Sequence, residues 1–151
     1  DNVRVDQLFR GVFNHFEADT RKEWETLISA DDERHSERLK ALIPFNGTAP
    51  GALACALAAI VDTTVIHGNY RFNPELWFKH CIQHAVAQGG DTDSVAAIVG
   101  SIAGGIVGYR HLPATWKRVL HGFNHEGTAL VEDNLIMLCL KALTAQQQAT
   151  S

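Results

Sequence analysis

Two aspartates and a serine lie close together in the segment GGDTDS at residues 89–94. Two carboxylates separated by one residue, with a hydroxyl beside the second, offer several oxygen ligands. Hard cations such as Mg²⁺, Mn²⁺ and Ca²⁺ prefer oxygen, whereas zinc more often takes nitrogen and sulfur. The preceding glycine pair permits a tight turn and close approach of a metal ion or substrate. The candidate metal ligands are Asp91, Asp93 and Ser94, and the candidate substrate contacts are Gly89 and Gly90.

The same segment has a purely structural interpretation. Asp91 or Thr92 suits a helix N-cap, and Asp93 suits a first helical turn because it faces the positive end of the helix dipole. Three ligands do not complete the octahedral shell of Mg²⁺, so other oxygen atoms or waters are required. An EF-hand is excluded because its acidic and glycine spacing does not continue after Ser94. Spacing alone leaves the metal and capping interpretations open.

The segment must be positioned by helices, because three- and four-residue apolar periodicity dominates the chain. Residues 52–65, opened by Pro50, form a predicted helix that is apolar on nearly all sides and therefore buried. Asn73 and Pro74 predict the start of an amphipathic helix that ends before the glycine pair. No convincing alternating run of strand type occurs. The predicted fold class is all-α.

A glycine-rich apolar helix is predicted over residues 95–109, after the acidic segment. Gly100, Gly104 and Gly108 share one face of it, at a cost of about 0.5–1 kcal/mol each relative to alanine. Close approach of another helix backbone is the simplest explanation for such a row. A short helix opened by Pro113 and a last helix over residues 126–143 are predicted to follow.

Length and composition limit the classes of protein to which the chain can belong. The chain has 151 residues, 46% hydrophobic residues and a net charge of −4, which indicates a soluble globular chain without a broad basic surface for nucleic acid or anionic lipid. Its apolar stretches are shorter than the roughly 20 residues of a membrane helix, so no membrane partner is expected. Cys55, Cys81 and Cys139 are expected to be buried, and their odd number favours a reducing, cytoplasmic location.

Three further residues invite a chemical interpretation. His80 and His84 are four apart, as zinc ligands on a helix are, but solvated histidines are the favoured interpretation. Asp62 lies in the buried helix and needs a partner. Structural hydrogen bonding is the favoured explanation for it, and a role beside the substrate is the alternative.

The segment GGDTDSVAAI at residues 89–98, the glycine-rich helix to Tyr109, and LPATW at residues 112–116 together resemble the C-terminal signature of the ADP-ribosylglycohydrolase family. That family includes the dinitrogenase reductase activating glycohydrolases and a jellyfish lens crystallin. The spacing from the acidic segment to the Pro-x-x-Trp element agrees, and so does the order of the two preceding helices. The resemblance extends from residue 45 to residue 143.

The resemblance implies a multi-helix orthogonal bundle with two Mg²⁺ ions, or Mn²⁺, in the complete enzyme. It implies hydrolysis of the glycosidic bond that joins ADP-ribose to a protein side chain or a small acceptor. Asp91, Asp93 and Ser94 match the C-terminal metal ligands of the family. The implied catalyst is a metal-activated water, with Asp91 and Asp93 as the contributing residues of this chain. The expected partner is an ADP-ribosylated protein or a small molecule containing ADP-ribose.

The chain also departs from the family pattern, because the Gly-Asp-x-x-Gly element and the Thr-Asp-Asp cluster of the N-terminal half are not found. We therefore expect a C-terminal half of the domain that needs an upstream segment for activity and can self-associate. The expected divisions are N-terminal helices over residues 1–44, the metal-motif part over 45–143 and a tail over 144–151. The alternative is a non-catalytic, crystallin-like relative that is structural or binds ADP-ribose or metal.

Overall fold

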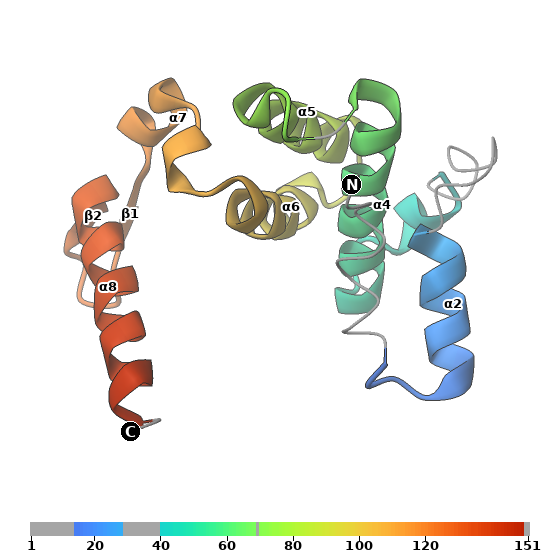
Figure 1. Cartoon of the computed structure of the whole chain (residues 1–151), viewed down its shortest axis with the longest axis horizontal. Helices are drawn as coiled ribbons and strands as arrows, with labels where there is room; N and C mark the ends of the chain where they lie inside the picture. The colour runs from blue at the N-terminus through green and yellow to red at the C-terminus, as the bar shows by residue number, and fades with distance from the viewer. Residues whose placement is uncertain (1–13, 29–39, 69, 150–151) are drawn as a thin grey trace. The chain divides into compact units, whose positions relative to one another are not determined.

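The computed structural model describes residues 14–28, 40–68 and 70–149. The chain forms two compact units, residues 1–112 and residues 113–151, and each is described by itself below. The described residues are mainly helical, as Figure 1 shows. The all-α prediction is confirmed.

Unit 1 is built from helices in its described part. Its elements are α2 (Ala18–Ile28), η1 (Ile43–Phe45), α4 (Ala49–His67), α5 (Pro74–Ala87), α6 (Thr92–Val107) and η2 (Tyr109–His111). Helices α4, α5 and α6 pack against one another, and Figure 1 shows α4 crossing the other two at a steep angle. Helix α2 packs against α4. The predicted division at residues 1–44 therefore contains α2, while its residues 1–13 and 29–39 lie outside the described part.

The core of unit 1 lies where α4, α5 and α6 meet. The apolar side chains that are fully shielded from solvent there are Cys55, Ala56, Ala59, Ile60, Cys81, Ala85, Val95, Val99 and Ala103. Trp77 is also buried, and its indole Nε1 donates a hydrogen bond to Thr64 Oγ1 at 3.2 Å. Burying an aliphatic side chain stabilises the fold by about 1.5–3 kcal/mol. Packing at this junction therefore fixes the two helices that flank the acidic segment.

Helix α4 extends beyond the predicted range 52–65 at both ends and has 19 residues. Thr48 caps its start, where the Gly51 N–H donates to Thr48 Oγ1 at 3.2 Å. By length and composition alone α4 is long and apolar enough to cross a membrane. However, 61% of its most apolar stretch is buried inside the structure. Packing against α2, α5 and α6 accounts for its apolar composition.

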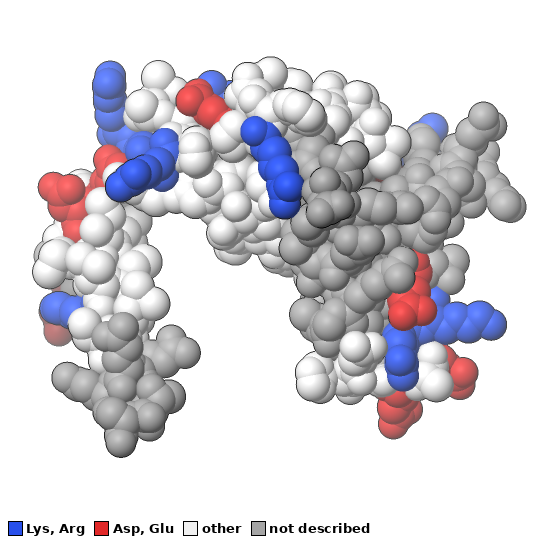
Figure 2. All heavy atoms as spheres, in the orientation of Figure 1, with Lys and Arg blue, Asp and Glu red and all other residues white. Residues whose placement is uncertain are grey.

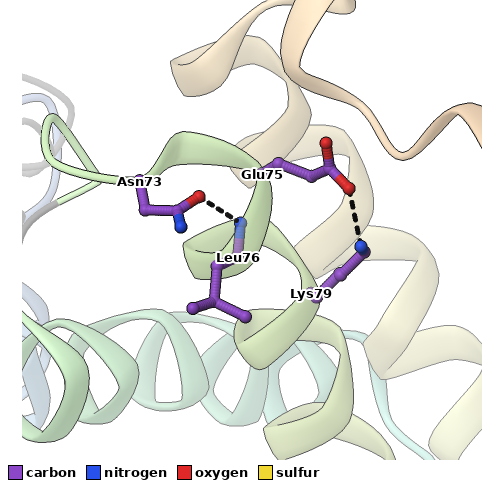
Figure 3. A network of polar contacts seen from close by, with 4 residues as sticks. All are labelled: Asn73, Glu75, Leu76 and Lys79. Atoms are coloured by element: carbon purple, nitrogen blue, oxygen red, sulfur yellow. Dashed lines mark hydrogen bonds and ion pairs between the residues drawn. The ribbon is translucent and has the colours of Figure 1, made fainter.

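Helix α5 begins at Pro74, as the sequence predicts. The Leu76 N–H donates to Asn73 Oδ1 at 3.1 Å, so Asn73 is the N-cap (Figure 3). Lys79 Nζ lies 2.6 Å from Glu75 Oε1, one helical turn away. The cap and this exposed i,i+4 pair both stabilise the first turns of the helix.

The glycine row of α6 faces side chains rather than another backbone, so that prediction is wrong in its detail. A Cβ at Gly100 would lie 3.6 Å from Ile82 Cδ1, and one at Gly104 would lie 3.7 Å from Phe78 Cε2. Gly108 is outside the helix as its C-cap, with φ of +78°. A Cβ at Gly100 or Gly104 would therefore make ordinary contacts with side chains of α5.

Unit 2 contains a short hairpin that the sequence did not predict. Its elements are α7 (Ala114–Val119), β1 (His121–Phe123), β2 (Ala129–Val131) and α8 (Glu132–Ala149). The strands are antiparallel, with Gly122 opposite Leu130. Residues 126–131 therefore belong to the hairpin, and the last helix begins at Glu132 instead of 126. That helix continues to Ala149, so residues 144–149 are helical rather than a separate tail.

The turn of the hairpin explains why helical periodicity was misleading there. Asn124 Oδ1 accepts hydrogen bonds from the N–H groups of Glu126 and Thr128, at 3.0 and 2.8 Å. Gly127 has φ of +78°, which a side chain would disfavour. These side-chain hydrogen bonds satisfy the N–H groups of Glu126 and Thr128 in a turn, so the backbone does not need a helix there.

Candidate metal site

The acidic segment forms a tight connection between α5 and α6. Gly89 and Gly90 have φ of +78° and +70°, the left-handed region that favours glycine. The Thr92 N–H donates to the Gly90 carbonyl at 2.9 Å, which closes the turn. The predicted role of the glycine pair in turning the backbone is confirmed. The turn places Asp91 immediately before the first residue of α6.

Asp91 is the N-cap residue of α6, but its side chain makes no capping hydrogen bond. Its interaction with Asp93 lowers the pKa of Asp93 below its ordinary value. The backbone N–H groups of Asp93 and Ser94 lower that pKa further. The capping interpretation therefore holds for the backbone of Asp91 and fails for its carboxylate.

When both carboxylates are ionised, a bound divalent cation offsets their like charges. Asp93 and Ser94 are exposed and Asp91 is partly exposed, so an ion in solution can reach all three. Asp93 is the one charged residue in α6, and Figure 2 shows that most of the visible surface over α5 and α6 is uncharged. No basic side chain of α6 therefore neutralises the pair.

The donor set fits a hard divalent cation chemically but does not complete its shell. Carboxylate and hydroxyl oxygens are the ligands that Mg²⁺ and Mn²⁺ prefer. Among residues 14–28, 40–68 and 70–149, no group of three or more His, Cys, Asp or Glu side chains is arranged to hold a metal ion. A metal ion at Asp91 and Asp93 would therefore need further oxygen ligands or waters.

Asn46 is a component of this site that the sequence did not reveal. Its Nδ2 donates to the Gly89 carbonyl at 2.9 Å, and its Oδ1 accepts from the Asp91 N–H at 3.1 Å. The sequence signal was Asn46-Gly47, which predicts a turn, and the chain does turn there. A turn signal carries no information about a partner more than forty residues away, so the contact was not predictable.

The family of the chain follows from comparison with known proteins. Residues 3–149 match the ADP-ribosylglycohydrolase family. The chain belongs to this family. It is also 43% identical over 61 residues to the ADP-ribosyl-[dinitrogen reductase] glycohydrolase of Rhodospirillum rubrum. That match covers 39% of the chain and 20% of the relative, and no solved structure matches.

Family membership does not account for a histidine cluster at the other end of α4, formed by His67, His80 and His84. The ring centroid of His67 lies 3.9 Å from that of His80 and 5.7 Å from that of His84. His80 Nδ1 is buried without a hydrogen-bond partner in the described part of the chain. His80 and His84 are partly exposed, so the interpretation of both as fully solvated side chains holds only in part.

Burial and the charges of neighbouring histidines lower the pKa values of His80 and His84. Burial is the main cause for both His80 and His84, and the charge of His67 adds to it. The charge of Asp62 acts in the opposite direction on His84, and His80 adds to the lowering. Asp62 is 8% exposed, and its charge acts on His84. The structural hydrogen bonding favoured for Asp62 stays a prediction.

Acid is expected to destabilise unit 1 through these histidines. In the unfolded chain they titrate near their ordinary value of 6.5, and in the fold His80 and His84 titrate lower. Between the two values the unfolded chain binds more protons, so stability is full above the ordinary value and falls as the pH drops below it. Urea unfolding followed from about pH 8 to pH 5 measures this.

A histidine variant tests whether the cluster causes the pH dependence of stability. His84→Gln is expected to reduce the loss of stability between pH 7 and 5, while His125→Gln, at a side chain 89% exposed, leaves it unchanged. An equal pH dependence in the wild type and His84→Gln would contradict the prediction.

The cysteines carry no part of the candidate chemistry. Cys55 and Cys81 are buried, and burial raises the pKa of both thiols, that of Cys81 to about 12. A thiol with so high a pKa is a poor nucleophile at neutral pH. Cys139 is exposed, so the expectation that all three are buried is wrong for it.

Proposed function

We propose that this chain contributes Asp91, Asp93 and Ser94 to a binuclear Mg²⁺ site that hydrolyses the glycosidic bond between ADP-ribose and an acceptor. The observation that carries the proposal is the turn before α6, which places two accessible carboxylates two residues apart and leaves that of Asp91 without a capping bond. Family membership supports glycohydrolase chemistry. The matched relative's name describes action on ADP-ribosylated dinitrogen reductase, and we propose an ADP-ribosylated protein or a small ADP-ribose compound as substrate here.

In the proposed mechanism Asp91, Asp93 and Ser94 would hold Mg²⁺ or Mn²⁺, which would supply Lewis-acid chemistry for ribose hydroxyls and a water. The carboxylates of Asp91 and Asp93 would bind the cation in the turn between α5 and α6. The Ser94 hydroxyl would add a neutral oxygen ligand. The glycine pair, without side chains, leaves space for the sugar beside the carboxylates. The remaining ligands come from outside the described residues or from water. The proposed location is the cytoplasm, supported by three free cysteines.

Release of ADP-ribose from an ADP-ribosylated protein tests the proposal. The natural protein that carries this sequence is expected to be active with Mg²⁺, to stop when EDTA is added and to resume when Mg²⁺ is restored in excess. Turnover that persists in EDTA would contradict the metal mechanism. A protein inactive with both Mg²⁺ and Mn²⁺ would favour the non-catalytic alternative, which the incomplete ligand set of the described residues also supports.

A further inference from the structure

The side chain of Asn46 joins the start of α4 to the acidic segment. It lies between η1 and Thr48, the N-cap of α4, and it is 3% exposed. Both ends of its amide are used, one as donor to the Gly89 carbonyl and the other as acceptor from the Asp91 N–H. A buried amide with both groups bonded has one preferred orientation, because rotation would leave the backbone groups unsatisfied.

Gly90 lies against this amide so closely that no side chain fits. A Cβ at Gly90 would lie 2.6 Å from Asn46 Oδ1 and 2.7 Å from its Nδ2. At Gly89, by contrast, a Cβ would have no neighbour within 4 Å. The turn therefore passes directly over the Asn46 amide, and the two glycines have different roles.

We propose that Asn46 is the positioning residue of the metal site, which it serves by holding the backbone of Asp91. The inference rests on the proposed function, because it gives Asn46 no role as a ligand. The Asp91 carboxylate makes no capping bond to α6. The backbone N–H of Asp91 is held instead by Asn46 Oδ1, at 3.1 Å. Loss of the bridge lets Asp91 move relative to Asp93, and the spacing of the two carboxylates is no longer fixed.

Amide hydrogen exchange of the metal-free chain tests the bridge without using activity. In Asn46→Ala the Asp91 amide is expected to exchange at least ten times faster, while the Val95 amide, bonded to the Asp91 carbonyl within α6, changes much less. Asn46→Ser, whose hydroxyl is too short to bridge both backbone groups, is expected to speed exchange of that amide as well. Asn73→Ala, which removes an asparagine cap from α5, is the matched control and leaves Asp91 unchanged.

Binding of Mn²⁺ to the same variants tests the consequence for the site. Asn46→Ala is expected to weaken Mn²⁺ binding at least tenfold, and Asn73→Ala to leave it unchanged. Equal exchange at Asp91 and Val95, or unchanged Mn²⁺ affinity with a faster Asp91 amide, would overturn the inference. If Asn46→Ala does not fold, an Asp91 amide that exchanges no faster in Asn46→Ser than in the wild type would overturn it instead. If the wild-type chain binds no Mn²⁺, the proposed function fails, and the exchange data alone decide whether Asn46 holds Asp91.

Discussion

Gly51→Ala is expected to destabilise unit 1 by about 2–3 kcal/mol, because the added methyl group has no space. A Cβ at Gly51 would lie 1.9 Å from the Phe45 carbonyl oxygen and 2.9 Å from Thr48 Oγ1. The first neighbour is backbone, so rotation of a side chain does not relieve the clash. Either η1 or the start of α4 must shift, and both lie beside Asn46. The free energy of unfolding in urea measures the effect.

Gly105→Ala is the matched control and is expected to have the opposite sign. Gly105 is also inside a helix, and a Cβ there would have no neighbour within 4 Å. Alanine is favoured over glycine in a helix by about 0.5–1 kcal/mol, so the variant should be more stable than the wild type. Equal stability of the two variants would show that helix propensity, rather than the clash with Phe45, determines the effect at Gly51.

Mn²⁺ is expected to stabilise the wild-type chain against unfolding, and Asp93→Ala is expected to abolish that stabilisation. An ion that binds only the folded state, present at a hundredfold over its Kd, raises the free energy of unfolding by about 2.7 kcal/mol. The rise requires the Asp91–Asp93 pair, because a lone carboxylate at a helix N-terminus does not overcome the positive end of the dipole. Urea unfolding with Mn²⁺ and with EDTA measures the difference.

Glu75→Gln is the control for this experiment. Glu75 is likewise an acid in the first turn of a helix, but its partner is Lys79 rather than a second carboxylate. The variant is expected to lose little stability and to retain the full stabilisation by Mn²⁺. If Asp93→Ala keeps the stabilisation, or Glu75→Gln loses it, the cation binds elsewhere. Asp93→Ala is also expected to stop Mg²⁺-dependent release of ADP-ribose.

The helices of unit 1 were predictable where local signals determine them. Asn73 and Pro74 mark the start of α5 because the cap and the fixed proline φ act within one turn. The glycine pair after α5 was equally clear, since left-handed backbone strongly favours glycine. The hairpin at β1 and β2 was missed because three-residue strands are too short to show alternation.

The candidate site was predictable only in part, since its ligands are contiguous in sequence and its support is not. Asp91 and Asp93 stand two residues apart, so their types and spacing are visible directly. Whether Asp91 caps α6 depends on side-chain orientation, which spacing does not determine. Asn46 and the contact of His67 with His80 arise from packing between helices, and single-sequence periodicity contains no record of such pairs.

The uneven exposure of the three thiols has a practical consequence for labelling. Cys139 lies in α8 of unit 2 and is exposed, whereas Cys55 and Cys81 are buried in the core of unit 1. A maleimide dye is therefore directed to one position in the native chain, without replacement of any cysteine. That position is in the unit that does not contain Asp91 and Asp93, so a fluorophore can follow unit 2 during metal titrations while the carboxylates stay unmodified.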